Sequence, residues 1–511
     1  MDPRAEHSLV SRRSLLAFAS GLTGAGLLAA CGAAPATSVA GTSTSGSASA
    51  ATSGSTSASA APSTASATKA AATTASAAAT TSAGATGAAK PTATIPAGLQ
   101  PTTYGGSGGP HLQVWWPNGS KDLALDASAQ AFLKTHPTWS IELSYTNGIP
   151  KFLTAVASDT APDVYLYTTD QMLQFAAKGI LLPLDDYIAQ DKVDMKQYFK
   201  AASLDLTYKN KTYGMPEHLD VGSIYQNDRL LQTVGMDPSK GPQSWDDLVA
   251  INQHVTKLNG KDLERVGFVP TWGWPVDTVG WLQANGADIL NADGTKVAFN
   301  NAAGSEALNW VATQIKTLGG TDAINAFKKP YKSGSGDALA HDALATELMG
   351  VWDIAYTILK IAPNLALSQW SMPGGPSIPG KQLDFFIAEL IFIPSGSKQH
   401  DDAWQFVKWH SGPGGQQFIQ TVEGAWDIAC IPSVAGDPAS IKAQPWRTRA
   451  NELMAKAETS ASILSPAGDD MQSAMNKVAA DLWAGKQDVS TTMTQMAQQA
   501  QAILDKYNSG S

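Results

Sequence analysis

The chain has few cysteines, no basic cluster and no apolar run long enough to span a bilayer. Only two cysteines, Cys31 and Cys430, occur among 511 residues. A disulfide framework is therefore excluded, and a large hydrophobic core must stabilise the fold. The formal net charge is -9, which argues against a nucleic-acid partner, because nucleic acid attracts basic surfaces. No apolar stretch reaches the roughly 20 residues of a transmembrane helix.

The first thirty residues have the features of an export signal. The basic sequence SRRSLL precedes an apolar run from Ala17 to Ala30 that contains small residues. This order is typical of a signal peptide, so we predict one at residues 1–30. The pair Arg12 and Arg13 resembles a twin-arginine address, which the export machinery reads as a label. The choice between Sec and twin-arginine export stays open at this point.

The apolar run ends in the sequence LAACG, at residues 28–32. This sequence resembles the bacterial lipoprotein box, in which cleavage exposes the cysteine for lipid attachment. Residues 31–105 are then expected to be a lipidated Cys31 followed by a tether of Ala, Ser, Thr, Gly and Pro, which has too little apolar area to fold. The protein would be anchored to the membrane without spanning it, and Cys430 would have no disulfide partner.

Strands and helices alternate after the tether. Apolar runs at residues 112–116, 141–145 and 164–167 read as strands, with helical patterns between them. This alternation is typical of an α/β fold with a parallel sheet. A single core stops growing at about 250–300 residues, so the folded part should divide into lobes.

Helix signals are clear at three places. Asp170 is a candidate N-cap for a helix that stops at Gly179, because Asp favours the first position and Gly the position after the end. Ser244 and Asp247 form a predicted capping box. Apolar stripes with several Met and Leu, in the last helix among others, are interpreted as core, and His410 as a structural residue.

Several short motifs occur in the order typical of one family. They are APDV at 161–164, GILLPLD at 179–185, YGMP at 213–216, IYQN at 224–227, WDDL at 245–248, ANGAD at 284–288, MGVW at 349–352 and AWQF at 403–406. With them the chain resembles a family 1 extracellular solute-binding protein, the maltose-binding-protein type. The motifs cover nearly all of the chain from Leu112 to Tyr507.

The resemblance implies a two-lobed periplasmic-binding-protein fold of type II, with a parallel-core sheet in each lobe and a hinge that the chain crosses three times. The crossings are expected near residues 216–221, 388–391 and 429–434. The predicted lobe segments are 110–218 and 390–431 for the first lobe, and 219–389 and 432–508 for the second lobe.

The resemblance also implies a function. The protein would capture a sugar or oligosaccharide, expected to be neutral, between its lobes and deliver it to the transmembrane subunits of an ABC-type permease. It would act outside the cytoplasm as a monomer, with no catalysis, cofactor or metal. Two alternatives stay open, which are a secreted glycosidase and a solute sensor without transport. Genes for a permease beside this one would favour transport.

Sugars present flat C–H faces and hydroxyl rims, so their sites pair aromatic rings with polar side chains. Ligands of α/β sheets bind beyond the carboxyl ends of strands. Positions that match the family's sugar contacts are Trp116, Asn118, Ser120, Lys121, Tyr167 and Asp170. The family often has a carboxylate in place of Ser120, and both Asn118 and Ser120 also suit a turn.

Further candidates lie near the crossings and in later loops. Asp220 aligns with a ligand-binding acid of the family, and Glu217 or His218 could hold that role instead. Tryptophans that follow strands complete the predicted pocket, because an aromatic ring in such a loop suits sugar stacking better than core packing. They are Trp272, Trp274, Trp352 and, near the third crossing, Trp426.

Overall fold

A computed structural model describes residues 99–509, apart from residues 118, 120 and 423–426. The predicted signal peptide with Arg12 and Arg13, the lipid site at Cys31 and most of the tether therefore lie outside the described residues. Among the described helices, none combines the length and apolar character that crossing a membrane requires.

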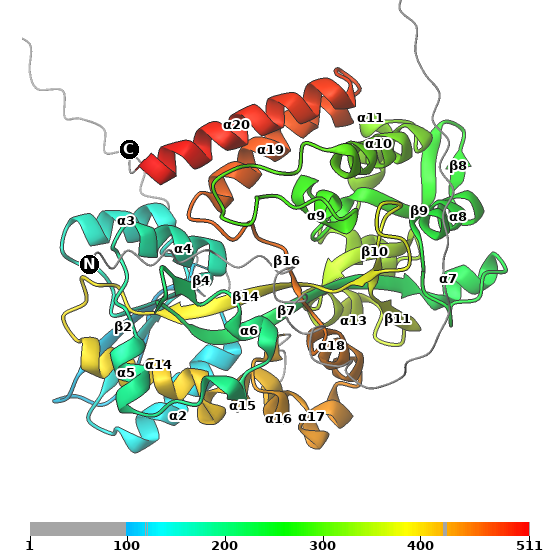
Figure 1. Ribbon diagram of the computed structural model, residues 1–511. Coiled ribbons are helices and arrows are strands. Elements are labelled where there is room, and N and C mark those ends of the chain that lie inside the picture. The colour runs from blue at the N-terminus through cyan, green and yellow to red at the C-terminus, as the bar shows by residue number, and fades with distance from the viewer. Residues whose placement is uncertain (1–98, 118, 120, 423–426, 510–511) are drawn as a thin grey trace, which may run out of the picture. The chain divides into compact units, whose positions relative to one another are not determined.

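One mixed sheet of 12 strands runs through the folded part. Its order is β1-β3-β2-β4-β14-β7-β10-β9-β8, with β11 and β15 also paired to β7 and β16 to β14. Strand β2 is parallel to β3 and β4, and β10 is parallel to β9, which confirms parallel pairing in each lobe. The long strands β7 and β14 pair antiparallel and join both halves into a single sheet (Figure 1).

The elements of the first lobe pack around one buried cluster that contains Leu112, Phe175 and Trp404. They are β1 (Thr102–Gly105), β2 (His111–Trp115), α2 (Leu123–Thr135), β3 (Ser140–Ser144), α3 (Ile149–Ala157), β4 (Val164–Thr168), α4 (Thr169–Ala177), α5 (Asp185–Gln190), η2 (Met195–Gln197), α6 (Lys200–Ser203), β5 (Thr207–Tyr208), β6 (Lys211–Thr212), α14 (His400–Ser411), α15 (Pro413–Thr421), β15 (Ile428–Ala429), α16 (Pro432–Ala435), α17 (Pro438–Ala443) and α18 (Trp446–Met454).

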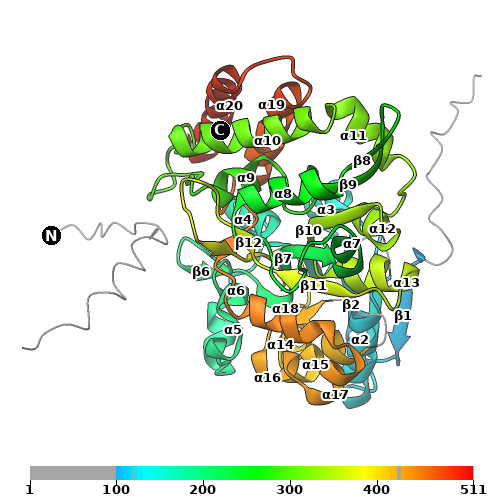
Figure 2. The ribbon, with the colours of Figure 1, turned by 90° about the vertical axis from the view of Figure 1, so that its right-hand side faces the viewer.

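The elements of the second lobe pack around two further clusters, which share helices α9 and α10. They are α7 (Asp228–Thr233), α8 (Trp245–Val255), β8 (Lys257–Asn259), β9 (Asp262–Gly273), α9 (Thr278–Ala284), α10 (Ala302–Thr317), α11 (Thr321–Lys328), α12 (Ser335–Ala340), β10 (Leu344–Gly350), the π-helical turn η3 (Ile354–Ile358), α13 (Leu359–Ile361), β11 (Leu367–Trp370), β12 (Met372–Pro373), β13 (Gln382–Leu383), α19 (Gly468–Trp483) and α20 (Val489–Ser509). Figure 2 shows α10, α19 and α20 above the strands and α14 to α17 below them.

Three strands connect the clusters. They are β7 (Met215–Asn227), β14 (Phe385–Phe392) and β16 (Thr459–Ser460). In β14, Phe385 belongs to the second cluster and Phe386 to the first. All 13 residues of β7 are buried, because its two ends lie under different lobes and its middle lies between neighbouring strands.

The third crossing is displaced from its predicted place near residues 429–434. Ala435, Ala450 and Ala457 are buried in the first cluster, and the third cluster resumes only at Ile463. Helices α16 to α18 therefore belong with the first lobe, and the chain crosses around β16. The other predicted lobe boundaries stay predictions.

Most helix signals are confirmed, with one correction. Ser244 and Asp247 form the capping box of α8, and Met493 and Met496 of α20 are buried. Gly179 has a left-handed backbone, with φ of 69°, just after α4. Thr168 occupies the N-cap position of α4, so Asp170 lies inside the first turn and does not cap the helix.

Candidate functional site

A cavity of about 390 Å³ lies between the two lobes. Both lobes and the strands that cross between them contribute side chains to it. The lining residues are Trp116, Pro117, Ile149, Tyr167, Thr168, Asp170, Gln171, Trp274, Ile387, Glu389, Ala461, Ser462, Asp469 and Gln472. The carboxyl ends of β2, β4 and β9 all open toward this cavity, as expected for an α/β sheet.

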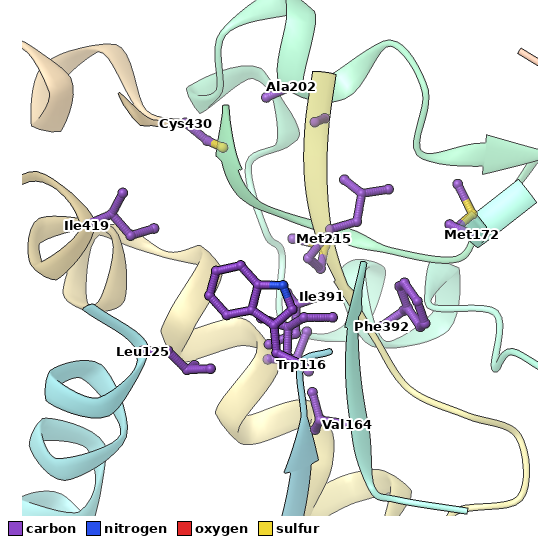
Figure 3. Packing of buried hydrophobic residues seen from close by; sticks show 14 of the residues in the cluster. Trp116, Leu125, Val164, Met172, Ala202, Met215, Ile391, Phe392, Ile419 and Cys430 are labelled. Carbon is purple, nitrogen blue, oxygen red and sulfur yellow. The ribbon is translucent and has the colours of Figure 1, made fainter. Parts of the chain in front are cut away.

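Trp116 and Tyr167 form the aromatic part of the first-lobe wall. Trp116 directly follows β2 and is only 5% exposed. Figure 3 shows its indole ring among buried apolar side chains that include Leu125 and Ile391. Tyr167 lies near the end of β4 and is partly exposed. The first-lobe wall therefore offers one buried aromatic ring, Trp116, and one partly exposed ring, Tyr167.

Trp274 supplies the aromatic wall from the second lobe. Its ring lies against Gly222 of β7, where an added Cβ would be 2.8 Å from the Trp274 Cζ3 atom. Behind it, the Trp352 ring centroid is 5.1 Å away at an interplanar angle of 58°. A glycine on the crossing strand thus lets the indole pack closely, and a second indole holds it in place.

Three carboxyl groups face the cavity. Asp170 comes from α4, Glu389 from the crossing strand β14 and Asp469 from the first turn of α19. One buried oxygen of each of two acids, Asp170 Oδ1 and Glu389 Oε2, has no hydrogen-bond partner among the described residues. Burial raises the pKa of Asp170 and raises that of Glu389 to about 8. Both acids line the cavity, and the oxygens of their carboxyl groups can accept hydrogen bonds.

Polar amides complete the wall. Gln171 Nε2 donates to Asp469 Oδ2 over 3.1 Å, which joins the two lobes across the cavity. Gln472 Nε2 donates to Asp277. None of the described lining residues is basic. The cavity therefore combines flat aromatic rings with hydrogen-bond acceptors and amides, a composition suited to an uncharged, hydroxyl-rich molecule.

The structure brings four of the predicted site residues together at this cavity, which are Trp116, Tyr167, Asp170 and Trp274. Three more, Asn118, Ser120 and Trp426, lie outside the described residues. The remaining four, Lys121, Asp220, Trp272 and Trp352, are described but are not among the lining residues. Their role in binding stays a prediction.

Each of these four has other neighbours. The ammonium of Lys121 is 3.0 Å from Asp126 Oδ2, and this ion pair raises the pKa of Lys121. Trp272 packs on α11, with its ring centroid 5.9 Å from that of Phe327. Trp352 lies behind Trp274, as described above. Asp220 is buried 3.5 Å from the Nε2 atom of His218.

Sequence reasoning missed Glu389, Asp469, Gln472, Ile387 and the 461–462 segment. It placed ligand contacts after strands and near the first and third crossings, whereas these residues lie within β14, next to β16 and at the start of α19. One signal was present. Glu389 interrupts the apolar strand FFIAELIF, and an acid in a buried strand is uncommon without a function.

The family model of the bacterial extracellular solute-binding proteins matches residues 115–417. The chain belongs to this family. This solute-binding protein is 23% identical over 281 residues to a binding protein of Brucella abortus, covering 51% of the chain and 60% of that relative. It is 21% identical over 300 residues to the maltotriose-binding protein of Pyrococcus abyssi, covering 57% and 59%. The chain thus spans about 60% of the length of these curated relatives.

Solved structures share the fold. The mannotriose complex of CpMnBP1 superposes with a TM-score of 0.67 at 24% identity, covering 76% of this chain and 99% of that one. The sugar-binding protein MalE of Xanthomonas citri gives 0.64 at 18% identity, covering 78% and 98%. Both agree with the two-lobed architecture of this solute-binding protein. The prediction of the fold from the sequence is confirmed.

Proposed function

We propose that this solute-binding protein captures a sugar or short oligosaccharide in the cavity between its lobes and delivers it to an ABC-type permease. One observation carries the proposal. Aromatic rings from both lobes, Trp116, Tyr167 and Trp274, share one cavity with the buried acids Asp170 and Glu389. Rings match the C–H faces of a sugar, and the oxygens of carboxyl groups accept hydrogen bonds from its hydroxyls.

Related proteins support a carbohydrate ligand. Structures with the same fold contain mannotriose, cycloalternan or maltose. In our protein the cavity of about 390 Å³ would suit a ligand of one to a few sugar rings. The absence of basic residues among its described lining residues favours a neutral sugar over a phosphorylated one.

Binding is expected to close the hinge. The crossing strands β7 and β14 lie under the cavity, and Gln171 and Asp469 already meet across it. A ligand that contacts both lobes favours the closed state, since only that state offers both sets of contacts. The closed protein would then present both lobes to the transmembrane subunits of a permease.

A panel of neutral mono- and oligosaccharides tests the proposal by thermal shift and intrinsic tryptophan fluorescence. The Asp469→Asn variant should bind the sugar found in the panel at least tenfold more weakly, because it replaces a carboxylate acceptor in the cavity. Asp470→Asn is the matched control, since Asp470 accepts a hydrogen bond from Tyr507 outside the cavity. No response to any sugar, or equal losses in both variants, would contradict the proposal.

The family places the protein outside the cytoplasm, and we propose that it is held there by a lipid on Cys31 after export directed by Arg12 and Arg13. The tether to about residue 105 would let the lobes reach the permease. Replacing Cys31 by Ala should abolish incorporation of radiolabelled lipid. Continued labelling of the variant would refute the anchor.

A further inference from the structure

Three metal-binding side chains meet beside the first crossing strand. His218 and Asp220 are two positions apart on β7 and so share one face of the sheet. Strand β15 pairs antiparallel with β7, with Ile428 opposite Leu219. This register brings Asp427, one position earlier, opposite Asp220. All three side chains are buried, with Asp427 2% and His218 3% exposed.

The spacing of these groups suits a small cation. His218 Nε2 lies 3.5 Å from Asp220 Oδ2 and 3.5 Å from Asp427 Oδ1. All three ligand atoms lie within 4.8 Å of one another. Ligands at about 2.0–2.2 Å from a tetrahedral ion are about 3.3–3.6 Å apart. Asp427 Oδ1 is buried with no hydrogen-bond partner among the described residues.

A second set of contacts orients the imidazole ring of His218, so that its Nε2 atom could bind a metal. Glu217 Oε2 lies at the other ring nitrogen of His218, Nδ1, at hydrogen-bond distance. The opposite oxygen of Glu217 is 3.0 Å from His410 Nε2, and His410 Nδ1 is 2.8 Å from Ser128 Oγ. A metal-bound histidine commonly donates its second N–H to a carboxylate, which leaves the other nitrogen free to bind the ion.

We propose that His218, Asp220 and Asp427 bind one divalent first-row cation of the zinc type inside the first lobe. Imidazole and carboxylate ligands together suit such ions. The sequence predicts no metal, because the site has a single imidazole and its acids are 207 positions apart (220 and 427). Antiparallel pairing of β7 with β15 is what brings them together. This role differs from the sugar contact that the family resemblance implies for Asp220.

The site lies directly behind the solute cavity. The Trp116 ring, which lines the cavity, has its centroid 5.7 Å from that of His218. Glu389, another lining residue, is the cross-strand partner of His218 in β14. A bound ion would therefore fix the side of β7 that supports the cavity wall, close to the point where the chain crosses to the second lobe.

Zinc titration of the chelator-treated protein by calorimetry, with metal analysis after gel filtration, tests the site. Zinc is supplied both to the native protein and during refolding, because the ligands are buried. We expect one zinc per chain. Glu217→Gln should weaken zinc binding about 10–100-fold, as for other residues that hold a ligand in place, and Asp427→Asn should weaken it more. Glu347→Gln removes a buried acid of the second lobe and should leave zinc binding unchanged.

X-ray absorption of the zinc-loaded wild type provides a test that does not depend on the folding of any variant. The expected first shell has one imidazole nitrogen and otherwise oxygen, with no sulfur from the buried Cys430. No zinc uptake by the wild type would overturn the proposal. Uptake that persists in Asp427→Asn, or a shell with sulfur or several imidazoles, would also overturn it.

Discussion

Trp272 and Trp274 are separated by one glycine, and yet they serve different parts of the molecule. Trp272 packs against Phe327 of α11, with the Lys328 ammonium 5.4 Å from its ring. Trp274 lines the cavity between the lobes and is backed by Trp352. Residues two apart on a regular strand share a face, so the strand pattern alone would have placed both rings on the same side.

Gly273 explains why the two rings separate. Its φ of 127° lies in a region that side chains disfavour. The pairing of β9 with β10 also shifts here, because Thr346 is opposite Phe268 whereas Leu348 is opposite Gly273. The extra residues of this bulge lie between Phe268 and Gly273, directly before the left-handed backbone of Gly273. The backbone geometry at the end of a strand therefore decides whether a tryptophan there points toward the cavity or packs against the core.

Gly273→Ala should have the largest effect on this arrangement. The new Cβ would collide with the main-chain oxygen of Leu348 and require a strained backbone. We expect a loss of at least about 3 kcal/mol in the free energy of unfolding, measured by urea denaturation. Gly485→Ala is the control for left-handed strain alone, since no heavy atom lies within 4 Å of its added Cβ. Equal losses in both variants would show that the collision is unimportant.

Trp272→Ala should reduce stability and leave solute affinity intact. The ring is partly buried against the second cluster, so the expected loss is about 2–3 kcal/mol, below that of a fully buried tryptophan. Urea denaturation and a solute titration on the same variant measure both quantities. A clear loss of affinity with unchanged stability would make Trp272 a ligand contact, as the sequence predicted.

Trp274→Ala should show the opposite pattern. Loss of an aromatic wall should weaken solute binding by about 1–3 kcal/mol, or roughly tenfold to a hundredfold, with a smaller change in melting temperature. Trp352→Ala removes only the ring behind it and should cost about 0.5–1.5 kcal/mol of affinity. Calorimetry checks both values. A larger effect at Trp352 than at Trp274 would place the cavity wall elsewhere.

Lys328→Met should change the pH dependence of stability. Burial lowers the pKa of Lys328 from 10.5 to about 8. Between these values the folded state binds fewer protons than the unfolded state, so raising the pH should stabilise the wild type. We expect the melting temperature of the wild type to rise relative to that of the variant between about pH 8 and 10. Parallel curves would show that Lys328 is solvated beside Trp272.

The order and type of the elements were readable from the chain. Parallel strands β2, β3 and β4, the capping box at Ser244 and the methionine stripe of α20 follow from local patterns and appear as predicted. These features depend on residues close in sequence, whose spacing on a helix or strand is determined by backbone geometry. The family motifs likewise depend on local order.

The candidate site was only partly readable. Aromatic residues after strands, such as Trp116 and Trp274, could be found because sugar chemistry and strand ends point to the same positions. Asp469 could not, since nothing local marks which turn of α19 borders the cavity, and Glu389 was marked only as an acid within an apolar strand. The position of the third crossing was wrong for the same reason. No local pattern in α16 to α18 indicates which lobe these helices pack against.

By itself, the sequence determined the family, the alternation of strands and helices and four residues that line the cavity. Tertiary structure decided which side chains meet. It separated Trp272 from the cavity that Trp274 lines. It also brought Glu389 and Asp469 to one cavity and placed Asp427 opposite Asp220. The physical reason is that these contacts depend on strand register and lobe packing, which join residues far apart in the chain and leave no periodic signal within it.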